Sequence, residues 1–453
     1  MTVEEIYQMV EKYADAAERA KKAGFDCVEL HAAHGYLVAQ FLSMHSNKRT
    51  DEFGGTLENR TRFMRLIIQA IRTRLGNDYP IILRISGGEF VTGGRDVTET
   101  RAVCKIAESC GVNAIDVSIG TYLTGFLSQG SCEKNPGFAS HLAAEVKKAV
   151  SIPVIAVGRI TDPHMAEELI SDGICDMVAI GRQSIADPQF PNKVLAGKLD
   201  EIIPCIGCCS CKVSNDFEDN IRRCAVNQFI GRGHDLKIEP VSTPKKVVIA
   251  GGGPAGLEAA WILARRGHNV TLYEKQVRLG GAFLAAAYPP GKSDLAKMIR
   301  YYLSQGKKYG VKYELGVNVD AALIESVKPD AVILATGSKP LLPNIEGIHN
   351  EQFLYPEDIL LGRVVPGKRV LVAGGGLIGA ELAEFIAEQG AGYRKVTIVE
   401  MQTDIALDAI YNQRIPLISR LKGLDVRFVT DAKIIKFNND GVVFVQDLSL
   451  IHI

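Results

Sequence analysis

The chain has 453 residues, of which 47% are hydrophobic and 23% are charged. This composition is typical of a globular protein with roughly two to four domains and a large core. Lysine plus arginine and aspartate plus glutamate number 52 each, which excludes a broadly basic nucleic-acid-binding protein.

The beginning of the sequence, MTVEEIYQMVEKYADAAERAKKAG, predicts an amphipathic helix with acidic residues throughout. It resembles neither a signal peptide nor an arginine-rich transit peptide. No apolar run reaches the roughly 18 residues of a membrane span, so no membrane association is expected. The expected location is the reducing cytoplasm, where clustered cysteines bind metals or act in catalysis more often than they form disulfides.

A strand followed by a helix repeats through residues 1–200, which predicts parallel β/α architecture. The predicted strands are Cys27–Leu30, Ile81–Ile85, Ala114–Val117, Val154–Val157 and Met177–Ile180. The predicted helices that follow are Leu57–Leu75, Val97–Cys110, Ala139–Val150, Asp162–Ser171 and Asp187–Ala196. Polar and glycine-rich strand ends are typical of a TIM barrel, but this segment holds five β/α units and a closed barrel needs eight. The sequence is consistent with two alternatives, a part of a barrel or an open sheet.

The first predicted strand ends in a cluster of polar rings within CVELHAAHGYL. His31 and His34 come at the strand end, and Tyr36 follows. Neutral imidazoles can hydrogen-bond a carbonyl or anionic oxygen, and a tyrosine hydroxyl can donate a proton. Surface histidines and a zinc pair are the alternatives, although zinc lacks a third ligand at a suitable spacing.

The segment IPCIGCCSCKVSNDFEDNIRRCAVN holds half of the chain's ten cysteines. Cys205, Cys208, Cys211 and Cys224 are separated by two, two and twelve residues, and four thiolates can hold a [4Fe–4S] cluster. Structural zinc more often uses two Cys-x-x-Cys pairs separated by about 15–20 residues, and it stays as the alternative. We interpret Cys209 as a thiol that does not bind the metal.

Residues 230–244 predict a linker, after which a glycine-rich turn joins a strand to a helix. In this turn Gly251 permits the sharp bend, Gly253 lets a pyrophosphate approach the backbone, and Gly256 lets the helix pack on the strand. The start of the helix favours phosphate. The next strand ends in Glu274, which is placed to accept a hydrogen bond from a ribose hydroxyl.

A second copy of this pattern begins at residue 368 and carries Gly374, Gly376 and Gly379. Its second strand ends in Glu400, and an acid there favours NADH because it would repel a 2′-phosphate. Between the copies, DAVILATGSKP resembles the return segment of flavoprotein disulfide reductases that bind two dinucleotides. That resemblance implies FAD, or at least its ADP part, in the first copy and NAD(P)H in the second. Two nicotinamide folds are the alternative.

The motifs HAAHGYL, QFLS, RTDEFGG and LENR-x-RF, in this order, resemble the Old Yellow Enzyme family of FMN-dependent oxidoreductases. The resemblance implies that His31 and His34 hold the oxygen of the substrate over the flavin and that Tyr36 donates a proton. It also implies that Arg84 lies beside the FMN pyrimidine, where a cation stabilises the reduced ring; an ordinary barrel salt bridge is the alternative. The acids and arginines of RTDEFGG and LENR are interpreted as structural.

Two later motifs, IAVGRI and VAIGRQSIADP, resemble the strand ends that hold the FMN phosphate in the same family. The residues concerned are Gly158, Arg159, Gly181 and Arg182. Phosphate binding after the last two strands is common in TIM barrels.

Barrel, cysteine segment and tandem folds together resemble the 2,4-dienoyl-CoA reductase, enoate reductase, bile-acid-inducible oxidoreductase and trimethylamine dehydrogenase group. Because the neighbouring flavins need one-electron transfer, the cluster is favoured over zinc, which carries no electrons. The resemblance implies that NADH reduces FAD, that the cluster relays single electrons, and that FMN delivers hydride to an activated C=C bond. The implied substrate is a small enone, enoate or enoyl-CoA. An amine dehydrogenase or desaturase, with electrons flowing outward, is the alternative.

The predicted fold is therefore α/β, with a partial (β/α)8 barrel, an iron–sulfur segment and tandem Rossmann-like domains. The predicted domains are residues 1–200, 201–240, 241–365 and 366–453. Because family members carry about three further β/α units at the start and more sequence at the end, we expect a fragment of a longer enzyme. An inactive fragment is the alternative to an active enzyme. The chain is also compatible with a homo-oligomer.

Overall fold

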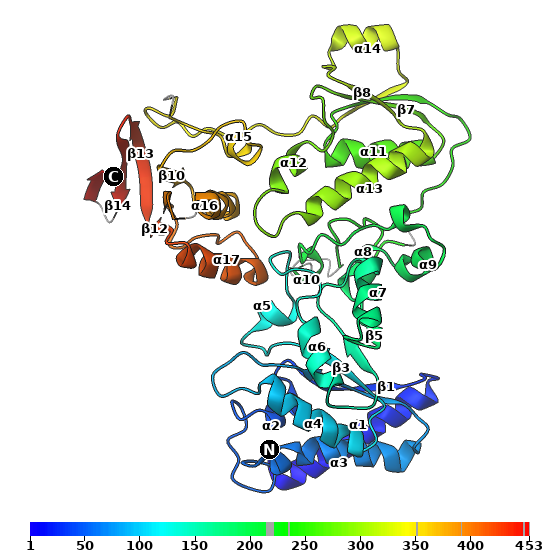
Figure 1. Cartoon of the computed structure of the whole chain (residues 1–453). Coiled ribbons are helices and arrows are strands. Elements are labelled where there is room, and N and C mark those ends of the chain that lie inside the picture. The colour runs from blue at the N-terminus through cyan, green and yellow to red at the C-terminus, as the bar shows by residue number, and fades with distance from the viewer. Residues whose placement is uncertain (214–221, 234–235, 350–351, 391, 447–448, 453) are drawn as a thin grey trace. The chain divides into compact units, whose positions relative to one another are not determined.

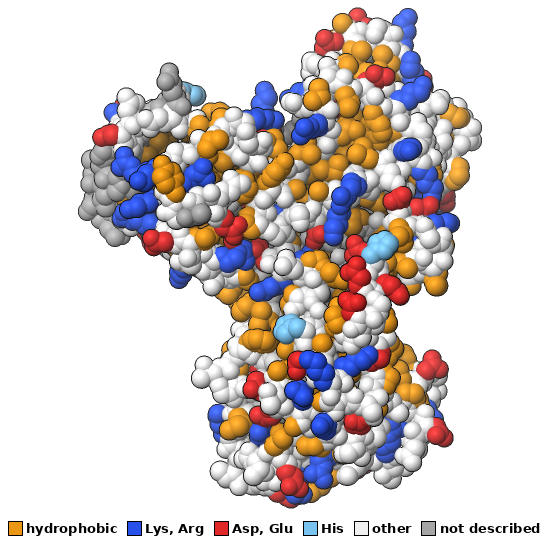
Figure 2. Space-filling model, viewed as in Figure 1, with side chains coloured by type: hydrophobic (Ala, Val, Ile, Leu, Met, Phe, Trp, Pro, Cys, Tyr) orange, Lys and Arg blue, Asp and Glu red, His pale blue; other side chains and the backbone are white. Residues whose placement is uncertain are grey.

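The computed structural model describes residues 1–453 apart from 214–221, 234–235, 350–351, 391, 447–448 and 453. The chain forms two compact units. The first unit comprises Met1–Gly130 and Lys134–Gln183, and the second comprises Ser131–Glu133 and Ser184–Ile453. Across the described part, no helix combines the length and apolar character needed to cross a bilayer. Basic and acidic side chains are interspersed over the face seen in Figure 2, in keeping with their equal numbers.

The first unit is built on a parallel sheet whose strands follow the chain order β1-β2-β3-β4-β5. The strands are β1 (Val28–Ala32), β2 (Ile81–Ser86), β3 (Ala114–Ser118), β4 (Val154–Ala156) and β5 (Met177–Val178). The helices are α1 (Val3–Lys22), α2 (Leu37–Leu42), α3 (Leu57–Leu75), α4 (Val97–Ser109), α5 (Gly125–Ser128), α6 (Ser140–Lys147) and α7 (Pro163–Ser171), with α8 (Arg182–Ala186) at the boundary of the units. This arrangement confirms the five predicted β/α units.

Local sequence explains where the long helices of this unit begin. Thr2 and Glu5 form a capping box at the start of α1, Thr56 caps α3, and Asp96 caps α4. The buried stripe of α1 packs against α3, and both helices contribute to one core with the strands (Figure 1). Burial of these apolar faces stabilises the sheet, and the polar residues predicted to form the site lie at the ends of its strands.

The described residues of the second unit form two parallel sheets and one antiparallel sheet. The first sheet has the order β8-β7-β6-β9, from β6 (Lys246–Ala250), β7 (Asn269–Glu274), β8 (Lys312–Leu315) and β9 (Ala331–Leu334). The second has the order β10-β11-β12, from β10 (Arg369–Ala373), β11 (Lys395–Val399) and β12 (Arg427–Val429). The third is the meander β13 (Ala432–Asn438), β14 (Gly441–Gln446) and β15 (Ser449–His452).

The helices of the second unit lie mainly beside its two parallel sheets (Figure 1). They are α9 (Phe190–Leu195), η1 (Leu199–Glu201), α10 (Ser210–Val213), α11 (Pro254–Arg265), α12 (Ala282–Ala286), α13 (Asp294–Tyr309), α14 (Ala321–Val327), α15 (Pro356–Leu360), α16 (Leu377–Gly390) and α17 (Tyr411–Gly423). Helices α11 and α16 start at the two glycine-rich turns, as predicted for tandem dinucleotide folds.

The helix predicted at 187–196 is shorter in the structure, where α9 begins at Phe190. The reason is the side chain of Asp187, whose carboxylate accepts hydrogen bonds from the backbone N–H groups of Gln189 and Ile203 and from Lys193 Nζ. An aspartate that captures local N–H groups in this way competes with helix formation at its own position.

Candidate functional site

The polar residues predicted at the end of β1 lie together. His31 is on β1, and the turn after it places the ring centroids of His31 and His34 5.1 Å apart. The ring of Tyr36 also lies 5.1 Å from that of His31. His34 and Gly35 both have positive φ angles, 60° and 76°, so the backbone turns sharply at His34 and directly after it. Three of the predicted site residues therefore form one cluster at the carboxyl end of a strand.

Two serines that the sequence did not single out anchor His34. Its Nε2 lies 2.6 Å from Ser118 Oγ, and its backbone N–H donates to Ser86 Oγ at 3.0 Å. Burial, together with the positive charge of Arg84, lowers the pKa of His34 to about 4. The imidazole is therefore neutral near pH 7 and can share a hydrogen bond with a carbonyl oxygen. Ser86 is the last residue of β2 and Ser118 is the last residue of β3. Aligning the ends of the predicted parallel strands could therefore have identified both serines from the sequence.

Arg84 lies in the same row of the sheet as His31. The parallel register pairs His31 with Arg84 and Arg84 with Asp116 on the next strand. Arg84 forms an ion pair with Asp116, whose side chain is only 3% exposed. Burial raises the pKa of Asp116, and the charge of Arg84 opposes that rise. The salt bridge considered as the alternative for Arg84 is therefore present, and its guanidinium is fixed at the polar edge of the sheet.

The predicted phosphate residues follow β4 and β5. Gly158 has a φ of 129°, and a Cβ there would lie 3.1 Å from the backbone nitrogen of Ala139, so glycine is needed. A Cβ on Gly181 would meet no atom within 4 Å. The guanidinium of Arg159 donates to Lys134 O, and that of Arg182 donates to Gly130 O at 2.6 Å. Both arginines thus fix the segment after α5, and their phosphate contact stays a prediction.

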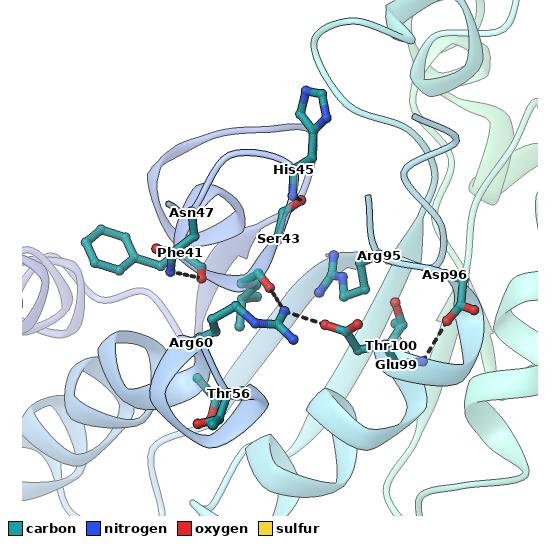
Figure 3. A network of polar contacts seen from close by, with 12 residues as sticks. Phe41, Ser43, His45, Asn47, Thr56, Arg60, Arg95, Asp96, Glu99 and Thr100 are labelled. Atoms are coloured by element: carbon teal, nitrogen blue, oxygen red, sulfur yellow. Dashed lines mark hydrogen bonds and ion pairs between the residues drawn. The ribbon is translucent and has the colours of Figure 1, made fainter. Parts of the chain in front are cut away.

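The motifs interpreted as structural hold the loop between α2 and α3. Arg60, from LENR, is buried and forms an ion pair with Glu99 while also donating to Leu42 O (Figure 3). Asn47 Nδ2 donates to the carbonyls of Phe41 and Phe53 at 2.7 and 2.8 Å. These contacts tie the loop after Tyr36 to α4, which agrees with a structural role for Arg60.

The predicted cluster ligands lie on both sides of residues 214–221, which are outside the described part of the chain. Cys211 is buried, whereas Cys205, Cys208 and Cys224 are half-buried. Burial raises the pKa of Cys224, and Cys208 is close enough to add to the rise. Among the described residues, no three or more His, Cys, Asp or Glu side chains are grouped to hold one metal ion. The cluster therefore stays a prediction. Cys209 is buried, with its Sγ donating to Gly207 O at 3.6 Å.

Both glycine-rich turns need glycine for steric reasons. A Cβ on Gly251 would lie 2.3 Å from Ala335 O, and one on Gly256 would lie 2.0 Å from Gly251 O. The second turn repeats this packing, because a Cβ on Gly379 would lie 2.0 Å from Gly374 O. Backbone and helix thus approach as closely as the dinucleotide-binding pattern requires.

The acids at the ends of β7 and β11 each bind their own turn. Glu274 accepts the N–H of Gly252 at 2.6 Å, and Glu400 accepts the N–H of Gly375 at 2.6 Å. Both side chains are largely buried. The carboxylates therefore lie beside the place where each helix starts, which is the position expected for ribose recognition.

Comparison with known proteins finds a different family for the first and second parts of the chain. Residues 1–201 match the NADH:flavin oxidoreductase / NADH oxidase family, and residues 245–451 match the pyridine nucleotide-disulphide oxidoreductase family. The NADH oxidase of Thermoanaerobacter brockii is 42% identical, with 98% of this chain and 69% of that protein covered. The cinnamate reductase of Clostridium sporogenes is 39% identical, with 89% of this chain and 62% of that protein covered.

Solved structures resemble the whole chain. A 2-naphthoyl-CoA reductase in complex with 2-naphthoyl-CoA has a TM-score of 0.94 and 35% identity, covering 100% of this chain and 69% of that one. Histamine dehydrogenase from Rhizobium sp. 4-9 has a TM-score of 0.87 and 27% identity, covering 100% of this chain and 68% of that one.

Proposed function

Since the chain belongs to the NADH:flavin oxidoreductase / NADH oxidase family, we propose that it uses electrons from NADH to reduce an activated C=C bond. The substrate class is an enone, enoate or enoyl-CoA. The observation that carries this proposal is the neutral imidazole of His34 beside His31 and Tyr36 at the end of β1. A neutral pair suits a carbonyl oxygen, which needs hydrogen bonds rather than a full counter-charge.

In this proposal the residues of the first unit bind and orient the substrate. His31 and His34 hold the carbonyl oxygen, and Tyr36, which is 48% exposed, donates the proton. When bound, FMN supplies the hydride. The cradle for its phosphate would be Gly158 and Gly181, and the open space beside Gly181, where a Cβ would meet no atom within 4 Å, leaves room for it. The fixed guanidinium of Arg84 would face the flavin ring.

Each part of the chain would bind one of the groups that carry the electrons or receive them. Residues 1–200 would bind FMN and substrate, 201–240 a [4Fe–4S] cluster, 241–365 FAD, and 366–453 NADH. The FAD residues would be Gly251, Gly253, Gly256 and Glu274, and the NADH residues would be Gly374, Gly376, Gly379 and Glu400. The cysteine donor set, Cys205, Cys208, Cys211 and Cys224, supports a cluster because thiolates are its usual ligands.

Oxidation of an amine is the second candidate function. It is favoured by the edge-to-face contact of Tyr36 with Tyr122, whose ring centroids are 5.7 Å apart and whose side chains are both exposed. Paired aromatic rings attract organic cations. The T-shaped pair stands at the same end of β1 as the histidines, so one set of assays can compare the two functions.

The proposal predicts that NADH bleaches the flavin anaerobically and that an enone or cinnamate restores the colour. His34→Ala should weaken binding of the enone about tenfold, because one hydrogen bond to the carbonyl is lost, and should leave bleaching by NADH unchanged. His141→Ala, on the exposed surface of α6, is the matched control. Binding that is unchanged in His34→Ala would remove its assigned role. Bleaching by an amine, with no reoxidation by any enone, would favour the second function.

The cluster proposal predicts different results for two neighbouring cysteines. After anaerobic reconstitution, Cys208→Ser should lose most of the bound iron and sulfide, because a serine oxygen is a poor substitute for thiolate. Cys209→Ser should retain both, because its Sγ is engaged with Gly207 O. The measurement is iron and sulfide content with the visible spectrum. Equal loss in both variants would contradict the assignment of the ligands.

A further inference from the structure

The two glycine-rich turns of the second unit allow an internal comparison, because each is covered by a short segment held in the same way. The N–H of Gly280 donates to Gly252 O at 2.8 Å in the first turn. The N–H of Ala406 donates to Gly375 O at 2.7 Å in the second. Residues 280 and 406 therefore correspond, as do Glu274 and Glu400, each of which binds its own turn.

Beyond this shared hydrogen bond the two segments differ in charge. In the first turn, Gly281 follows, and a Cβ on it would lie 2.9 Å from Gly253 Cα, so backbone meets backbone. In the second turn, Asp408 Oδ1 accepts the N–H of Leu377 at 2.8 Å. A Cβ on Gly376 would lie 3.4 Å from the same carboxylate. The residue that corresponds to Asp408 in the first turn is an alanine.

Asp408 therefore lies against the first residue of α16 and the middle glycine of the turn. In a dinucleotide fold this is where the pyrophosphate binds, through N–H groups at the helix start. A carboxylate and a pyrophosphate are both anionic and cannot share one N–H without repulsion. The repulsion would be moderate, because Asp408 is exposed to solvent.

The segment that carries Asp408 is itself well fixed. Ile405 and Ala406 are fully buried, and Arg414 Nε donates to Ile405 O at 3.0 Å. Ala406 has a φ of 53°, a conformation that is uncommon outside glycine. The carboxylate is thus presented to the turn by a backbone that cannot easily move away.

We propose that Asp408 competes with the dinucleotide pyrophosphate at the second turn and thereby makes this the exchangeable nucleotide site. This inference rests on the proposed function, in which the second turn binds NADH. A fold that keeps FAD gains from tight binding, and the first turn has no carboxylate in this position. A fold that must release NAD⁺ after every turnover gains from weaker binding, and the second turn has one.

The test is calorimetric titration of the full chain with NAD⁺ and with ADP-ribose. Asp408→Asn keeps an oxygen that can accept the Leu377 N–H but removes the charge, so both ligands should bind about tenfold more tightly. The gain should shrink at high salt concentration. Asp404→Asn is the matched control, because Asp404 lies in the same segment but pairs with Arg414. It should bind NAD⁺ as the unaltered chain does.

A reciprocal variant covers the case in which Asp408→Asn does not fold. Ala282→Asp places a carboxylate at the corresponding position of the first turn and should weaken retention of FAD about tenfold. Unchanged or weaker NAD⁺ binding by folded Asp408→Asn, or unchanged FAD retention by Ala282→Asp, would overturn the inference and leave Asp408 as a simple helix cap. Failure of the unaltered chain and of both Asn variants to bind NAD⁺ would instead overturn the proposed nucleotide site.

Discussion

Arg420→Met is expected to lower the free energy of unfolding of the second unit by about 3–5 kcal/mol. Arg420, on α17, forms ion pairs with Glu384 and Glu133, whose side chains are 0% and 2% exposed. Burial already raises the pKa of Glu133, and Arg420 opposes that rise. Without the guanidinium, two carboxylates would stay buried with less compensation, which is among the costliest single changes in a protein.

The measurement is urea unfolding followed at two pH values. In the variant the pKa of Glu133 should rise further, so the folded state would bind more protons than the unfolded state. Its stability should therefore fall as pH rises, and the loss should be larger at about pH 8 than at about pH 5. Arg363→Met is the control, because its partners Asp358 and Glu357 are on the surface, and little change is expected. Equal, small effects in both variants would refute a stabilising role for the buried pairs.

Gly256→Ala is expected to disrupt the first dinucleotide fold, whereas Gly253→Ala should leave it folded. A Cβ on Gly256 would lie 2.0 Å from Gly251 O, a backbone atom that cannot move aside. The expected loss of stability is about 3 kcal/mol. A Cβ on Gly253 would meet only Gly281 Cα, at 3.9 Å. This methyl group would obstruct the pyrophosphate, so FAD binding should weaken without loss of structure.

Thermal unfolding by circular dichroism and titration with FAD separate the two effects. Gly256→Ala should lower both the midpoint of unfolding and the affinity for FAD. Gly253→Ala should lower the affinity alone. If both variants unfold at the temperature of the unaltered chain and bind FAD normally, the turn does not hold the dinucleotide.

Sequence patterns predicted those features that depend on neighbours along the chain. Helix α3 has the predicted bounds, Leu57–Leu75, because an apolar stripe follows the cap of Thr56. The glycines of both turns were identified because strand, turn, helix and acid follow one another within about 30 residues. The start of α9 was missed because Asp187 captures the N–H of Ile203, a contact between residues 16 positions apart.

Features that depend on strands far apart in the sequence were not predictable in the same way. Ser118 is 84 residues from His34, and Asp116 is 32 residues from Arg84. Their contacts depend on the register of β1, β2 and β3, which no single segment of sequence encodes. The position of Asp408 at the second turn was not predicted for the same reason, since its partner Leu377 is 31 residues away.

The row formed by His31, Arg84 and Asp116 has a consequence for how the site assembles. Each residue comes from a different strand, and the three meet only when β1, β2 and β3 align as they do. Moving β2 by one residue would turn the arginine to the opposite face of the sheet. The ion pair of Arg84 with Asp116 therefore forms only when the three strands have reached their native alignment.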